Sequence, residues 1–175
     1  MALRSSPTKT TQFSTLTVRA QSLNPPCLVN TKLVSFQIQN LSLVTVGNNY
    51  YNNVTVFKGN LVFYFYSPQS SITITNETLV NNVLDDLYQV GSAANVYVKD
   101  FLVRGNVNTG SITETSAILS VSTASGVCKI DNFQVSDSVF IYGKAIEIDS
   151  AVKLVVTNGL YINNTLQDQD FFSFD

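Results

Sequence analysis

The chain has 175 residues, of which 45% are hydrophobic and 11% aromatic, so it can form one folded domain with a substantial core. Only 13% of the residues are charged and the net charge is -2 without a basic cluster, which excludes an electrostatic footprint for nucleic acid. The sequence has no histidine and only two cysteines, so we predict neither a metal site nor a cofactor. Its uncharged Asn, Ser and Thr are typical of an extracellular or particle-surface protein.

The first 33 residues are expected to form an N-terminal strand or cap region. Residues 1–12 are mostly polar and lack the apolar segment of a secretory signal, so we expect a secreted form to come from a longer precursor. Residues 13–20 alternate apolar with polar side chains and predict a strand that places Leu16 and Val18 on one face. The prolines in residues 24–26 end this strand.

A pair of strands joined at Asn40 is predicted over residues 32–46. Residues 47–53 follow as a loop, because Gly and Asn are frequent among them. No apolar run in the chain reaches the length of a membrane span, so we expect no membrane-spanning segment.

The most hydrophobic stretch, residues 54–66, carries apolar side chains on both faces of a predicted strand. One interpretation is a central strand whose tyrosine face, with Tyr64 and Tyr66, packs under a loop. The other is an aromatic platform that stacks on a sugar or on a neighbouring subunit.

Three later segments depart from the strand pattern. Residues 80–91 have apolar side chains near a helical period and are the one place where the sequence favours a short helix. Residues 105–115 are polar and predict a loop that bulges from the domain. The acidic tail, residues 166–175, contains three phenylalanines that need a cover, which is either the last turn of the domain or a partner.

An apolar-x-apolar-x-Asn (or Asp) pattern recurs five times and organises the chain. Alternating apolar residues predict a strand with one buried face, and the Asn or Asp, which tolerates a left-handed backbone, predicts a tight corner. The copies are roughly 24 to 36 residues apart, an uneven spacing that favours stacked coils with loops of variable length. They cover residues 36–40, 72–76, 96–100, 128–132 and 154–158.

This pattern resembles that of the right-handed parallel β-helix family, the fold of pectin lyases, polygalacturonases and phage tailspikes. The resemblance covers about residues 34–165 and implies an all-β, single-stranded right-handed β-solenoid in one domain, with an antiparallel jelly roll as the alternative. In that family, stacked Asn side chains form a ladder at one corner, and Asp100 departs from this rule. The resemblance assigns the ladder to Asn40, Asn76, Asn132 and Asn158.

The apolar residues of the five copies are predicted to line the core, coil on coil. Cys128 takes one of these positions, which favours a small buried core residue over a disulfide with Cys27. The full set is Phe36, Ile38, Ile72, Ile74, Val96, Val98, Cys128, Ile130, Leu154 and Val156.

Paired carboxylates are the remaining catalytic option, since enzymes of this family use Asp or Glu. Glu147 and Asp149 are predicted to project outward together, and Asp85 and Asp86 lie in the predicted helix. Neither pair has the apolar surroundings that raise the pKa of a catalytic acid, so we interpret them as a solvated face and expect no enzyme.

Four N-glycosylation sequons occur. The chain is so rich in Asn, Ser and Thr that this number is expected by chance. Asn53 and Asn163 are predicted to lie in loops and to be the modified sites. Asn40 and Asn76 are predicted to have their amides engaged in the ladder.

We therefore expect a non-catalytic structural or surface-interaction protein, a building block of an extracellular fibre, coat or adhesin. It would assemble head to tail with copies of itself or with a similar module, because the outer coils of a β-helix have unpaired edges. The alternatives are a carbohydrate-binding or polysaccharide-cleaving β-helix module and a viral capsid or tailspike domain. The expected contact places the tail residues Phe171, Phe172 and Phe174 on Phe13, Leu16 and Val18 of a neighbour.

Overall fold

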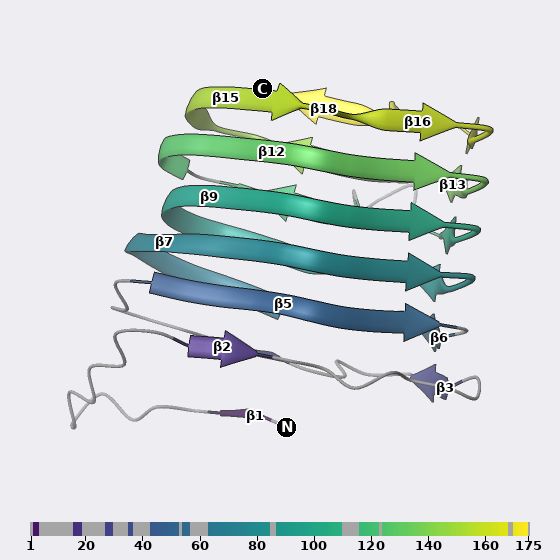
Figure 1. Ribbon diagram of the computed structural model, residues 1–175, viewed down its shortest axis with the longest axis horizontal. Coiled ribbons are helices and arrows are strands. Elements are labelled where there is room, and N and C mark those ends of the chain that lie inside the picture. Colours follow the sequence, from purple (N-terminus) through teal and green to yellow (C-terminus); the bar gives the residue numbers. More distant parts are fainter. Residues whose placement is uncertain are drawn as a thin grey trace.

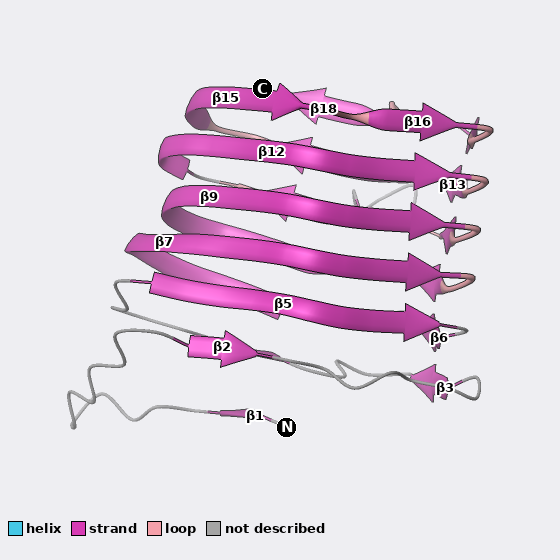
Figure 2. Cartoon of the chain, in the orientation of Figure 1, coloured by secondary structure: helices cyan, strands magenta, loops and turns pink. Residues whose placement is uncertain are grey.

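The chain folds into a right-handed parallel β-helix of about four turns (Figures 1 and 2). The ordered elements in the part of the chain that the structure describes are all strands, joined by turns and bends. This computed structural model describes residues 2–3, 16–18, 27–29, 35–36, 43–52, 54–56, 63–84, 87–109, 116–122, 124–167 and 170–174.

Long strands stack one above another along one side of the solenoid (Figure 1). Each continues past a corner onto a second side of the coil, and β7 and β9 also begin on the side before it. In order these are β5 (Leu43–Asn52), β7 (Phe63–Val80), β9 (Tyr88–Arg104), β12 (Ala124–Ser136) and the pair β15 (Ala151–Thr157) and β16 (Leu160–Ile162). All of their pairings are parallel, so the jelly-roll alternative is wrong.

Short strands complete each coil. A six-stranded sheet contains β3 (Cys27–Val29), β6 (Val54–Val56), β8 (Val83–Leu84), β10 (Val107–Asn108), β13 (Val139–Ile141) and β17 (Thr165–Gln167). The remaining side contains β11 (Ser116–Val121), β14 (Gly143–Ile148) and β18 (Phe172–Phe174). These strands stack in one column above the first halves of β7 and β9. At the N-terminal end, β2 (Leu16–Val18) pairs with β5, and β1 (Ala2–Leu3) pairs with β4 (Ser35–Phe36).

Four of the five predicted copies stack in register, as expected. Ile72 pairs with Val96, Val96 with Cys128, and Cys128 with Leu154. Ile74 and Val98 lie in the next inward column and are buried. Because the side chains of a strand alternate between its faces, this register aligns the apolar face of every coil with the bore.

The prediction that residues 36–40 form the first copy is wrong. Val44 pairs with Ile72 and Val46 with Ile74, whereas Phe36 lies in β4 and pairs with Leu3. Residues 44–48 carry the same alternation, and their Gly47 suits a close approach, since a Cβ there would lie 2.6 Å from the Thr75 carbonyl oxygen. Ile38 and Asn40 lie outside the described residues.

The predicted helix over residues 80–91 is also wrong. Val83–Leu84 is strand β8, and β9 begins at Tyr88. Leu84, Leu87 and Tyr88 are all buried because the chain turns around the bore, and this turning mimics a helical period. Likewise, residues 105–109 stay in the coil as a corner and strand β10, while residues 110–115 lie outside the described part.

Aromatic rings fill the centre of the bore. Phe101 and Phe133 stack with ring centroids 4.9 Å apart, and Tyr88 meets the edge of Phe101 at 5.8 Å. Tyr88 also donates a hydrogen bond from its hydroxyl to the buried Glu77 carboxylate. Cys128 is a free, buried thiol, and burial raises its pKa to about 11, so it remains protonated at neutral pH.

Candidate functional site

Each coil turns its first corner at a residue with a left-handed backbone. Asn76, Asp100, Asn132 and Asn158 have φ between 54° and 56°, and Asn48, rather than Asn40, supplies the corner of the coil before them. The Asn76 amide donates to Asn48 Oδ1 at 3.2 Å, and the Asn132 amide donates to Asp100 Oδ1 at 2.8 Å. These hydrogen bonds join the corner residues in pairs, with the Asp taking part.

A second corner lies five residues after the first in four of the described coils. Asn81, Gly105, Asp137 and Asn163 have φ between 52° and 62°. The sequence-based prediction missed this corner, although Asn, Asp or Gly recurs at this spacing and these are the residues that adopt a left-handed backbone most readily.

A continuous ladder follows immediately inside the second corner. It consists of Asn82, Asn106, Ser138 and Asn164, which we call the inner ladder; the first three are almost completely buried. Asn106 Oδ1 accepts a hydrogen bond from the Asn82 backbone N–H at 2.8 Å, and Asn164 Oδ1 accepts one from the Ser138 N–H at 3.1 Å. Ser138 Oγ accepts from the Asn106 N–H at 3.2 Å.

The amide NH2 groups of the inner ladder bind carbonyl groups of the preceding coil. Asn82 donates to the Tyr51 carbonyl at 3.1 Å, Asn106 to the Leu79 carbonyl at 2.9 Å, and Asn164 to the Val135 carbonyl at 3.0 Å. Each ladder asparagine thus provides hydrogen bonds to backbone groups beside the second corner, where buried polar groups need partners.

The strands of the last coil, β15 to β18, form hydrogen-bonded pairs only with the coil below them in the described part of the chain. Within the described residues these strands pair with β12, β13 and β14 below them and with no strand above (Figure 1). Its exposed large apolar side chains are 42% to 78% accessible: Val152, Val156, Leu160, Ile162, Leu166 and Phe174.

Three of these exposed side chains occupy core columns. Val156 pairs with Ile130, Leu166 with Phe140, and Phe174 with Ile148, and each of these lower partners is at most 2% exposed. The same columns that are dry in the middle of the solenoid are therefore open at this end.

The aromatic tail completes the last coil. Phe172 pairs with Ile146 in strand β18, and Phe171 packs edge-on against Phe140 and Tyr161 with ring centroids 5.1 Å apart. Leu16 and Val18 lie in β2 at the opposite end of the solenoid, so one chain does not bring them to its own tail (Figure 1). Phe13 lies outside the described residues.

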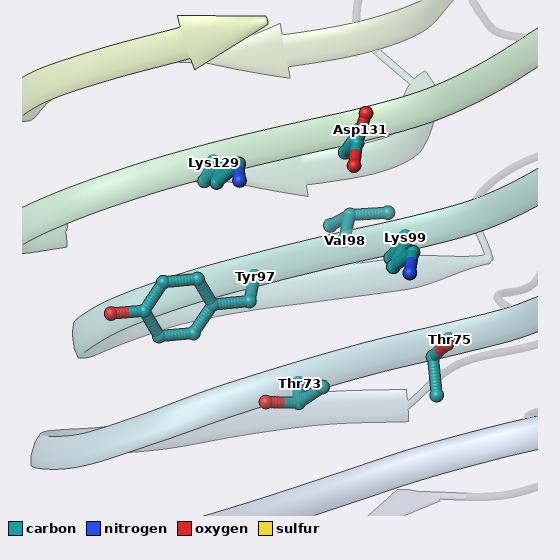
Figure 3. Close-up of a pocket in the computed structure, with 7 residues that line it drawn as sticks. All are labelled: Thr73, Thr75, Tyr97, Val98, Lys99, Lys129 and Asp131. Atoms are coloured by element: carbon teal, nitrogen blue, oxygen red, sulfur yellow. The ribbon is translucent and has the colours of Figure 1, made fainter. Parts of the chain in front are cut away.

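An open groove crosses the outer face of β7, β9 and β12 (Figure 3). Tyr97 lies in it, 38% exposed, in register with Thr73 on one side and Lys129 on the other. Hydrogen bonds from Thr157 Oγ1 and the Asn158 amide, both at 2.8 Å, lower the pKa of Asp131 at its edge. An exposed ring beside ammonium and hydroxyl groups can stack on a sugar and bind an anionic substituent. The full lining is Thr73, Thr75, Tyr97, Val98, Lys99, Lys129 and Asp131.

The predicted solvated acid face is wrong for Glu147. Its carboxylate forms a buried ion pair with Lys144, with Nζ and Oε1 2.6 Å apart and both residues 8% exposed. Asp149 is exposed, as expected. Asp85 and Asp86 lie outside the described part of the chain, within which no three His, Cys, Asp or Glu side chains gather as a metal site.

The two described sequon asparagines have similar surroundings. Asn76 and Asn163 are both exposed corner residues, and the Asn163 amide donates to Asp137 Oδ1 at 3.3 Å. Asn163 is therefore a corner rather than a loop residue, and glycosylation there stays a prediction. Asn40 and Asn53 lie outside the described residues.

Tyr66, from the tyrosine face predicted in residues 54–66, is exposed on β7.

A scan against protein-family models matches no family, and searches of curated proteins and of solved structures return no significant match. Among the described residues there is no helix long and apolar enough to cross a membrane.

Proposed function

We propose that this protein is a non-catalytic structural or surface-interaction protein, a building block that assembles end to end. The observation that carries the proposal is the open end of the core, where Val156, Leu166 and Phe174 are 42%, 45% and 46% exposed above buried partners. Docking of a further coil would bury these side chains, and complete burial of one such side chain contributes roughly 1.5–3 kcal/mol.

Unpaired strand edges add to this apolar surface. β15 to β18 present backbone N–H and C=O groups that template another parallel strand. The opposite end of the same sheet carries β2, whose Leu16 and Val18 continue the columns that end at Leu154 and Val156. A second copy docked in register would extend these columns, with β18 taking the place that β1 holds beside β4. Repetition of this head-to-tail contact produces a fibre.

The proposed location is extracellular or on a cell or particle surface. The low charge and the Asn-, Ser- and Thr-rich composition support it, and the parallel coils with Asn at their corners support a distant relation to pectin-lyase-like β-helices. A tailspike-like domain is a special case of this function. Glycosylation at Asn53 and Asn163 belongs to the same proposal, and peptide mapping after expression in a eukaryotic secretory host tests it.

The assembly test compares the full chain with variants of the last coil. We expect wild type to form oligomers that grow with concentration in size-exclusion chromatography with light scattering, and filaments by electron microscopy. Val156→Lys with Leu166→Lys should leave a monomer, because the charges lie in the open core columns. The matched control is Leu160→Lys, which is similarly exposed at 47% but in register with the outward-facing Gln134, and it should assemble. A wild-type monomer at high concentration would refute the proposal.

The groove around Tyr97 favours a second candidate function, carbohydrate binding. The exposed ring, Lys129 and Thr73 support recognition of an anionic glycan. Calorimetry with pectate and with a neutral glucan would test this, with a parallel assay for polysaccharide cleavage. Tyr97→Ala should abolish pectate binding and Tyr66→Ala, the exposed control outside the groove, should retain it.

A further inference from the structure

The inner ladder has a direction. Asn106 and Asn164 each bind two backbone groups of the coil before them: the N–H of the preceding ladder residue and the C=O of the residue three positions before that ladder residue. Asn106 binds the Asn82 N–H and the Leu79 C=O, and Asn164 binds the Ser138 N–H and the Val135 C=O. The side chains therefore reach toward the N-terminal end, while the backbone groups that they bind face the C-terminal end.

The equivalent backbone groups of the last coil are the Asn164 N–H and the Tyr161 C=O. They follow from the register, because Val135 pairs with Tyr161, and Val139 with Thr165, so that Ser138 precedes Asn164 in the ladder column. We call these two groups the open rung, since no described strand lies above β16 and β17. The open rung is shaped for the side-chain amide of one more ladder asparagine.

The other end of the ladder column does not carry such an amide. Val54 pairs with Cys27, and Thr55 with Val83, so the column runs from Cys27 through Val54 to Asn82. A copy docked in register brings residue 27 to the open rung. A thiol is a weak donor and a weak acceptor, so cysteine cannot replace the paired hydrogen bonds of an amide.

We infer that the C-terminal end of this β-helix selects a coil with asparagine at the inner-ladder position, and that a coil with Cys27 there binds it more weakly. The inference rests on the proposed end-to-end assembly and specifies its partner: a β-helical module whose first coil presents an asparagine to the Asn164 N–H and the Tyr161 C=O. Because the core columns match in either case, the ladder residue decides which module docks more tightly.

The probe is the full chain with Cys27→Asn, compared with Cys27→Leu, which has nearly the same shape without the amide. Sedimentation velocity over a concentration series measures end-to-end association. We expect Cys27→Asn to associate about tenfold more tightly than wild type or Cys27→Leu, because it adds two hydrogen bonds. Cys27→Ser, which places at residue 27 the hydroxyl that Ser138 contributes to the ladder, should give a smaller, severalfold gain, and it tests the inference if Cys27→Asn fails to fold. Equal association of the Leu, Ser and Asn variants would overturn the inference.

A second pair of variants tests the open rung itself in the Cys27→Asn background. Asn164→Pro removes the N–H of the open rung, whereas Asn164→Ala keeps it, and both lose the side-chain bonds to the preceding coil. We expect the gain to survive Asn164→Ala and to disappear with Asn164→Pro. Survival of the gain in both variants would show that the N–H is not the contact.

The outcomes separate this inference from the proposed function. If wild type remains monomeric and Cys27→Asn associates, self-assembly of the wild type is refuted and the selectivity stands. If wild type assembles as tightly as Cys27→Asn, the assembly stands and the selectivity is refuted. If neither associates, both are refuted.

Discussion

Tyr88 donates its hydroxyl hydrogen to Glu77 inside the bore, where both residues are fully buried. Glu77 occupies the column position that Phe101 holds in the next coil, so a carboxylate lies where the two following coils stack aromatic rings. Burial, with further contributions from Tyr51 and Glu77, raises the pKa of Tyr88 well above its ordinary value, so the phenol remains a donor at all physiological pH.

Tyr88→Phe should lower the free energy of unfolding by about 1.5–3 kcal/mol, because a hydrogen bond to a buried carboxylate is lost while the ring packing is kept. Urea denaturation measures the change. Tyr66→Phe, at an exposed tyrosine, is the control and should be neutral. A Tyr88→Phe protein as stable as wild type would show that the hydroxyl makes no net contribution.

Asn106→Leu should destabilise the fold by about 2–4 kcal/mol. The substitution keeps the volume but leaves the Asn82 N–H and the Leu79 C=O buried without the partner that Asn106 provides. Asn76→Gly, at the exposed first corner, retains access to the left-handed backbone and should cost less than about 1 kcal/mol. Chemical denaturation of the two variants compares the contributions of the inner ladder and of the first corner to stability. A larger loss of stability in Asn76→Gly would contradict this prediction.

Ile74→Asp should cost about 3–5 kcal/mol, since it places an unpaired charge in a dry column between Val46 and Val98. Thr73→Asp, on the outward face of the same strand, is the matched control and should be tolerated. Thermal melts followed by circular dichroism compare them. Wild-type stability of Ile74→Asp would mean that the register is wrong.

The last coil should loosen in acid. Hydrogen bonds from Thr157 and then Asn158 lower the pKa of Asp131 below 3.8, so the folded state favours the carboxylate. The contribution of Asp131 is therefore complete above the unfolded pKa and is lost as pH falls through the lower folded pKa. Hydrogen exchange of β15 amides should accelerate in that range in wild type. In Asp131→Asn this acid-induced acceleration should be absent, and a matching acceleration would refute the role of Asp131.

The stacking of residues 72–76, 96–100, 128–132 and 154–158 was predictable from the sequence, because its causes are local. A strand exposes alternate side chains to opposite faces, and Asn or Asp tolerates the left-handed corner, so each copy carries its own instructions. The same local pattern is present in residues 36–40 and in residues 44–48, so it predicts a strand and corner equally well at either place. Only the packed structure chose the second, through the close approach of Gly47 to Thr75 and the pairing of Val44 with Ile72.

The candidate site depended more on tertiary structure. The aromatic tail was recognisable as a segment that needed cover, but its pairing with β14 requires coils distant in sequence to be stacked first. The inner ladder was missed for the same reason. Asn82, Asn106 and Asn164 follow no apolar alternation, and their role is set by backbone groups 24 to 31 residues away that only the winding of the solenoid brings within hydrogen-bonding distance. Local sequence thus determined the strands and the first corners. The register between coils decided which polar residues are buried, because a side chain is buried only where the coils above and below cover it.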